Sequence, residues 1–197
     1  MIRADRRWRM RKTWRGQRRN RHQAVKRESS GNSICVGCGL CCDGTLHPQT
    51  NVAADEIEAT RSAGLPLQEN EGTVTFRQPC PMFLGNCCSI YSMRPPVCRR
   101  YRCALLKNVE AGRISSKLAR EKIATAKALL AAAKASAPEA RTSADRAQIW
   151  SDLKARYAEL PESNRLVAAR GLLDIAALKS FLDRWFREKK SDGSPGV

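Results

Sequence analysis

Nine cysteines lie between residues 35 and 103 of this 197-residue chain. They fall in four blocks, which read Cys35-Val-Gly-Cys38-Gly-Leu-Cys41-Cys42, Pro79-Cys80-Pro81, Cys87-Cys88 and Cys98-Arg-Arg-Tyr-Arg-Cys103. Two residues between thiolates let both sulfurs reach one ion at about 2.3 Å. Gly37 and Gly39 suit such a loop, because a tight turn round an ion needs backbone freedom. The pattern predicts that these thiolates bind metal.

A disulfide framework is the main alternative explanation for so many cysteines. The odd number of cysteines argues against it, as do the adjacent Cys41 and Cys42, which do not readily pair with each other. The N-terminus is basic, but no apolar signal segment follows it, and no stretch is long enough to span a bilayer. We therefore expect a reducing, cytoplasmic location with no membrane association, where cysteine clusters more often bind metal.

The cysteine blocks also form one longer motif. The run Cys-x-x-Cys-x-x-Cys-Cys, then Cys-Pro, then Cys-x-Ile-Tyr-x-x-Arg-Pro-x-x-Cys-Arg resembles the YkgJ-type cysteine-cluster family, described as a zinc- or iron-chelating domain. The matching residues are Cys35, Cys38, Cys41, Cys42, Cys80, Pro81, Cys88, Ile90, Tyr91, Arg94, Pro95, Cys98 and Arg99. The resemblance covers about residues 33 to 103 and implies metal chelation. Cys103 fits a trailing cysteine of many such proteins, whereas Cys87 falls outside the pattern.

The motif cysteines and Cys103 together make eight predicted metal ligands: Cys35, Cys38, Cys41, Cys42, Cys80, Cys88, Cys98 and Cys103. Eight thiolates would fill two four-ligand sites, with the adjacent Cys41 and Cys42 serving different ions or bridging a pair. Alternatively, four of them hold one iron–sulfur cluster and the others are structural. All-sulfur tetrahedral ligation suits both zinc and iron. The interruption of the ferredoxin spacing by Cys41-Cys42 favours zinc or mononuclear iron. His47, before Pro48 in a polar loop, is a weaker candidate that we expect to be exposed.

Positive charge is concentrated at the N-terminus. Residues 1 to 30 contain 12 Lys or Arg and two acidic residues, a net charge of +10 out of +17 for the whole chain. We predict a disordered basic tail there, and its Arg residues with Trp8 and Trp14 suit weak contacts with nucleic acid. Near the last ligands, Arg94, Arg99, Arg100 and Arg102 are expected to offset the negative charge of four thiolates on a divalent ion.

Periodicity and turn residues predict the elements that carry these side chains. We expect a short helix over residues 55 to 63, a strand over 73 to 77, a turn at 85 to 86 and a returning strand over 88 to 91. Residues 104 to 135 are predicted to be helical, and residues 142 to 188 to form two more helices. The first of these begins at a Thr142–Asp145 capping box and the second follows Pro161. Ile175, Leu178, Leu182, Trp185 and Phe186 should form one buried stripe.

The expected fold is α+β, with a small cysteine-rich metal-binding core of short strands and a mainly α-helical C-terminal extension. The predicted divisions are a tail over 1–30, a metal-binding domain over 31–110 and a helical extension over 111–190. Hydrolase and nucleotide-binding motifs are absent from the sequence, while a redox enzyme stays open. Three functions remain: a zinc- or iron-binding protein in metal handling, an iron–sulfur electron-transfer protein, and a structural zinc domain with a nucleic-acid-binding tail.

Overall fold

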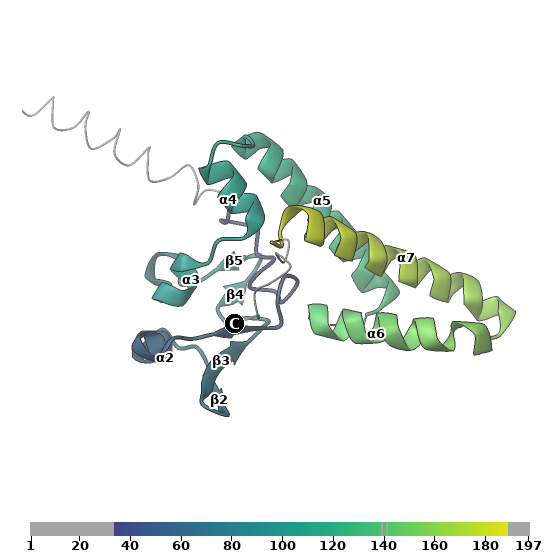
Figure 1. The fold of residues 1–197 in the computed structure, drawn as a ribbon, viewed down its shortest axis with the longest axis horizontal. Helices are drawn as coiled ribbons and strands as arrows, with labels where there is room; N and C mark the ends of the chain where they lie inside the picture. Colours follow the sequence, from purple (N-terminus) through teal and green to yellow (C-terminus); the bar gives the residue numbers. More distant parts are fainter. Residues whose placement is uncertain (1–33, 139, 141, 189–197) are drawn as a thin grey trace, which may run out of the picture.

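A computed structural model of the chain describes residues 34–138, 140 and 142–188. Short strands and helices form the cysteine-containing half, and longer helices form the other half (Figure 1). This arrangement confirms the predicted α+β class with a helical C-terminal extension. The predicted basic tail lies outside the described residues.

The first half contains β1 (Gln49–Asn51), η1 (Ala54–Glu56), α2 (Ile57–Ser62), β2 (Gln68–Asn70), β3 (Thr73–Arg77), β4 (Phe83–Leu84), β5 (Cys87–Cys88), η2 (Tyr91–Met93) and α3 (Pro96–Arg100). The second half contains α4 (Ala104–Glu110), α5 (Ser116–Ser136), α6 (Ser143–Arg156), η3 (Tyr157–Glu159) and α7 (Glu162–Trp185). Within the described ranges, no helix is both long enough and apolar enough to cross a membrane.

Two small antiparallel sheets carry the strands. The first has the order β1-β3-β2, and the second is the hairpin β4-β5. The predicted strand over 73–77 and the turn at Gly85–Asn86 are confirmed, and both turn residues have positive φ. The predicted returning strand is present as β5, but it covers Cys87–Cys88 rather than residues 88–91, and η2 begins at Tyr91. Since β4 has only two residues, a longer β5 would lack a partner.

The predicted helix over 104–135 is two helices. The N–H of Gly112, whose φ is +69°, donates to the carbonyl of Val109 and ends α4. Ser115 then caps α5 by accepting the N–H of Leu118 at 3.1 Å. The expected Thr142–Asp145 capping box is confirmed at the start of α6.

Helices α5 and α7 lie side by side over most of their length (Figure 1). The buried face of α5 consists of Ala119, Ile123, Ala126, Leu130 and Ala133. The predicted stripe of α7 is confirmed at Ile175, Leu178, Leu182 and Phe186, which are all buried, while Trp185 is half-buried. The small alanine side chains let the two helix backbones approach closely.

Two hydrophobic clusters form the core. The larger one joins the helices to the cysteine-containing half through Ile34, Leu40, Leu46, Leu105 and Leu106. The smaller one is built on the sheet side from Val52, Leu65, Phe76 and Cys80. Each cluster also contacts a different set of cysteines.

Candidate metal centre

The loop that carries the first four cysteines is held by tight turns. The N–H of Cys38 donates to the carbonyl of Cys35 at 3.1 Å, and the buried Leu40 anchors the loop in the larger core cluster. Gly39 has a φ of +74°, and a Cβ at this position would lie 2.3 Å from the ring of Phe83. Glycine is therefore needed here both for the backbone angle and for the close approach of hairpin β4-β5.

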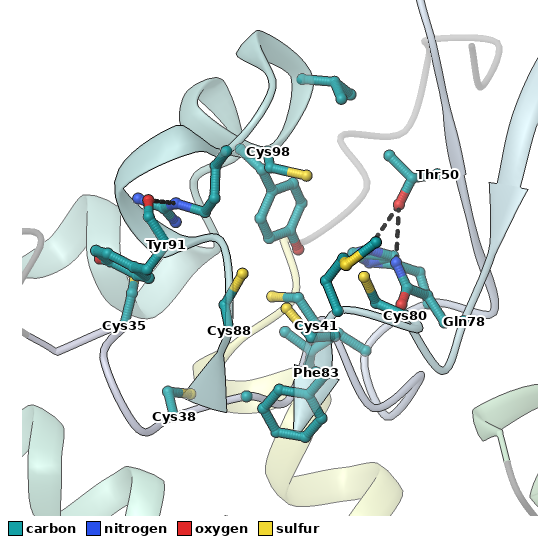
Figure 2. A pocket seen from close by; sticks show the side chains of 18 of the residues that line it. Cys35, Cys38, Cys41, Thr50, Gln78, Cys80, Phe83, Cys88, Tyr91 and Cys98 are labelled. Atoms are coloured by element: carbon teal, nitrogen blue, oxygen red, sulfur yellow. Dashed lines mark hydrogen bonds between the residues drawn. The ribbon is translucent and has the colours of Figure 1, made fainter. Parts of the chain in front are cut away.

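All nine cysteines line one cavity of about 690 Å³. Figure 2 shows their origin: Cys35, Cys38 and Cys41 come from the loop, and Cys80, Cys88 and Cys98 come from three later segments. All nine are free thiols. The fold therefore brings together cysteines that lie far apart in the sequence.

Four of these thiols form what we call the first thiol group, which consists of Cys35, Cys38, Cys41 and Cys103. Burial, followed by repulsion from Cys35 and Cys103, raises the pKa of Cys38 to about 12. Burial also raises the pKa of Cys41 well above its usual value, with Cys103 as the strongest of the neighbouring charges that add to the effect. All four residues pack against the larger core cluster.

The other four predicted ligands form the second thiol group, which consists of Cys42, Cys80, Cys88 and Cys98. Burial, then repulsion from the other three members, raises the pKa of Cys42 to about 12. The pKa of Cys98 rises to about 11, because of burial and then the neighbouring Cys80 and Cys88. Cys42, Cys80 and Cys98 belong to the smaller core cluster or pack against it. Packing on the two core clusters thus places the boundary between Cys41 and Cys42, and the groups meet there, since Cys42 is among the neighbours that raise the pKa of Cys41.

Backbone amides point toward several of these sulfurs. The backbone N–H of Leu40 donates to the sulfur of Cys38. Those of Leu105 and Leu106 donate to the sulfur of Cys103, and those of Met82 and Phe83 to the sulfur of Cys80. Each of these hydrogen bonds favours the thiolate and so opposes the rise in pKa that burial causes. Amide donors to sulfur also stabilise thiolates that coordinate a metal.

Arg94 is the cation common to both groups. Its positive charge lowers the pKa of Cys35 in the first group and of Cys42 and Cys98 in the second, against the larger effect of burial. The guanidinium lies 3.8 Å from the ring centroid of Tyr91, and its Nε donates to the Tyr91 carbonyl at 3.1 Å. The predicted charge-balancing role thus fits Arg94 well.

The other predicted arginines differ in their partners. Arg99 donates to the carbonyls of Arg94 at 2.6 Å and Ser92 at 2.8 Å, and so stabilises the backbone around η2. Arg100 forms an ion pair with the buried Glu56 at 2.6 Å. Arg102 forms an ion pair with Glu110 at 3.0 Å, and its charge lowers the pKa of Cys35 against the larger effect of burial, as expected.

Lys127 was missed by reasoning from the sequence. It projects from α5, its Nζ donates to the carbonyl of Gly37, and its charge acts against the burial-driven rise in the pKa of Cys38. The signal in the sequence was weak. Lys127 follows the buried Ala126 on α5, and the packing of α5 against α7 decides which face of the helix is buried.

His47 is half-buried rather than exposed, and it lines the same cavity. Its ring centroid lies 5.1 Å from that of Tyr101, and its Nε2 is 3.4 Å from the hydroxyl of Thr50. Burial, and then the charge of Arg187, lowers the pKa of His47. His47 therefore lines the same cavity as the thiols, and its contacts are with the ring of Tyr101 and the hydroxyl of Thr50.

The donor set fits four-sulfur coordination. Each thiol group offers four sulfurs, and zinc and iron–sulfur centres both take such a set. Within the part of the chain that the structure describes, no three His, Cys, Asp or Glu side chains are arranged so that they could hold one metal ion. The structure thus gathers the donors round one cavity but does not arrange them as a closed coordination shell.

Comparison with known proteins yields one match. Residues 34–129 match the family model CxxCxxCC, "Putative zinc- or iron-chelating domain". No curated protein and no solved structure matches the chain. The match includes all nine cysteines and extends into α5, beyond the 33–103 range of the sequence resemblance. Residues 34–129 of this chain are thus similar to the zinc- or iron-chelating domains of the CxxCxxCC family.

Proposed function

We propose that this protein binds two metal ions, zinc or iron, with one ion in each thiol group. The supporting observation is the division of the eight predicted ligands into two groups of four, with adjacent Cys41 and Cys42 on opposite sides of the division. Four thiolates complete a tetrahedral shell without any further ligand. The cation Arg94 beside both groups offsets part of the charge of two such centres.

We infer a role in metal handling, meaning the uptake and release of these ions. The exposed Cys87 belongs to the lining of the cavity, so the cavity reaches the protein surface. A centre that small chelators and partner thiols can reach exchanges its ion more readily than one sealed in a core. An iron–sulfur redox centre is the competing assignment for the same thiols, and the experiment below separates the two.

The test is elemental analysis of protein purified without oxygen, together with its colour. We expect two zinc or iron ions per chain, and about one ion fewer in Cys38→Ser and in Cys98→Ser, because each variant removes one ligand from a different group. Zinc protein is colourless since zinc is d¹⁰, whereas brown protein that releases inorganic sulfide would establish an iron–sulfur cluster. Unchanged metal content in both variants would contradict the ligand assignment.

A further inference from the structure

The helical half of the chain contacts the backbone that carries the first thiol group. From α5, the Nζ of Lys127 donates to the carbonyl of Gly37, which lies between Cys35 and Cys38. From the end of α7, the carbonyl of Phe186 accepts the N–H of Ala104 at 3.1 Å, directly after Cys103. Two helices therefore hold the two separate chain segments that supply this group.

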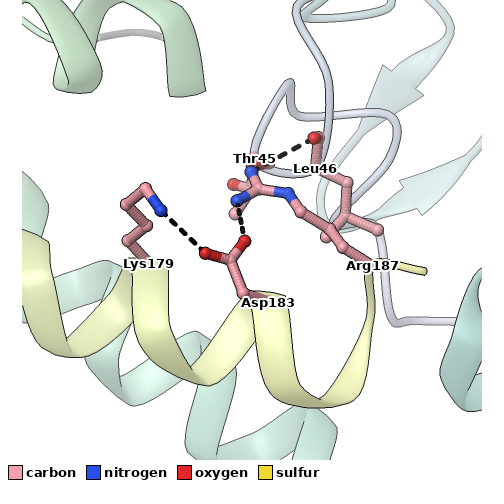
Figure 3. A network of polar contacts seen from close by, with 5 residues as sticks. All are labelled: Thr45, Leu46, Lys179, Asp183 and Arg187. Carbon is pink, nitrogen blue, oxygen red and sulfur yellow. Dashed lines mark hydrogen bonds and ion pairs between the residues drawn. The ribbon is translucent and has the colours of Figure 1, made fainter. Parts of the chain in front are cut away.

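Arg187 makes the third such contact (Figure 3). Its Nη2 donates to the carbonyl of Leu46 at 3.3 Å and of Thr45 at 3.5 Å. The N–H of Leu46 donates in turn to the carbonyl of Leu40 at 2.9 Å, directly before Cys41 of the first group. Its Nη1 pairs with Asp183 at 2.7 Å, and Asp183 also accepts from Lys179 at 2.8 Å. Asp183 therefore orients the guanidinium toward the loop.

The second thiol group rests on shorter elements. Cys88 lies on the two-residue strand β5, and Cys98 lies on the five-residue helix α3. The N–H of Cys80 donates to the carbonyl of Cys42 at 2.7 Å, a contact within the group itself. These segments pack on the smaller core cluster, whereas the first group packs on the larger cluster shared with α5 and α7. Elements with few buried contacts open more often than those packed on a large core.

We propose that Arg187 is a positioning residue for the first centre, and that the two centres consequently release their ions at different rates. The first-centre ion leaves slowly, because its loop must come away from the end of α7. The second-centre ion leaves quickly, because β5 and α3 open without disturbing the helices. This inference rests on the proposed function, since it needs an ion in each thiol group.

The experiment loads the full-length protein with zinc and follows its transfer to an excess of a colorimetric chelator. We expect two phases of one ion each. Cys98→Ser should remove the fast phase, and Cys38→Ser the slow one. Arg187→Ala should speed the slow phase by about tenfold, since a charge-assisted hydrogen bond contributes enough for such a change. The fast phase of Arg187→Ala should match the wild type.

Two further variants separate positioning from general stability. Arg187→Lys keeps the charge and one donor, and should restore part of the slow rate. Lys179→Ala loses the other ion pair of Asp183 without touching the loop, and should leave both phases unchanged. If Arg187→Ala alters neither phase, or speeds both equally, the inference is overturned while the two-centre proposal stands. Zinc loading below two ions per wild-type chain overturns both.

Discussion

At Cys87 and Cys88, two adjacent thiols have different surroundings. Successive side chains of a strand point to opposite faces, so only one of the pair can face the sulfurs of the second group. Cys88 contributes to the raised pKa of Cys42 and Cys98, whereas Cys87 is exposed. This difference favours Cys88 over Cys87 as the proposed ligand.

We expect substitutions of Cys87 and Cys88 to differ in their effect on metal content. Cys87→Ser should keep the metal content of the wild type and lose less than about 0.5 kcal/mol of unfolding free energy, as exposed substitutions do. Cys88→Ser, its matched partner, should lose about one ion per chain. Elemental analysis and urea unfolding of both variants provide the measurement. Equal metal loss in the two would show that Cys87 is also a ligand.

A second prediction concerns pH. Burial raises the pKa of Cys38 and Cys42 to about 12, so both thiols are protonated at pH 7 before an ion binds. Coordination requires thiolates, and zinc binding must therefore release protons. We expect about four protons per zinc ion, and an affinity that increases as pH rises and falls as pH drops. A zinc titration in weakly buffered indicator solution measures the release. Two or fewer protons per ion would contradict four-thiolate binding.

At the scale of elements, the cysteine loop and hairpin β4-β5 fit together at one point. Gly37 and Gly39 have nearly the same positive φ, but only at Gly39 would a Cβ meet another side chain, the ring of Phe83. The hairpin carries Cys88 of the second group, and the loop carries most of the first. The contact between Gly39 and Phe83 therefore sets the spacing of the two groups.

This pair of glycines makes a matched test. Gly37→Ala should cost only the left-handed backbone strain of about 1 kcal/mol. Gly39→Ala should cost about 1 to 3 kcal/mol more, because the ring of Phe83 must move. Urea unfolding of the two variants checks the difference, and zinc content shows whether the loop still binds. Equal destabilisation of the two variants would show that the ring of Phe83 moves aside without a loss of stability.

At the scale of the whole molecule, one core cluster extends from the cysteine loop to the C-terminal helix. Ile34 and Leu40 beside the cysteines belong to the same cluster as Ile175 and Leu182 of α7. Unfolding of the loop would expose part of the helical core. Metal binding should therefore stabilise the helices, although they supply none of the predicted ligands.

Removing the metal tests this coupling. A strong chelator should lower the free energy of unfolding, measured from the helical circular dichroism signal, by about 4 kcal/mol for each ion that it removes, relative to protein with free zinc at a thousand times the dissociation constant. The double variant Cys38→Ser, Cys98→Ser should respond much less, because both centres are impaired. Identical unfolding curves with and without chelator in the wild type would rule out the coupling.

Local features were predictable from the sequence because they depend on neighbouring residues. The capping box at Thr142 and Asp145 and the turn at Gly85 and Asn86 each involve only a few positions, and both are confirmed. The break at Gly112 was missed, because the alanine- and lysine-rich composition around it favours helix on both sides. Helix propensity alone therefore does not predict where one helix ends and the next begins.

The sequence by itself determined the α+β class, the family and the set of cysteines in the motif, since these depend on residue type and spacing. Only the tertiary structure decided which thiols lie together, because the division between Cys41 and Cys42 depends on segments far away in the sequence, such as that of Cys103, 62 residues after Cys41 (103 − 41). It also decided that Lys127 approaches the first group while Arg99 and Arg100 contact other partners. A long cationic side chain reaches several partners from one position, and packing alone selects among them.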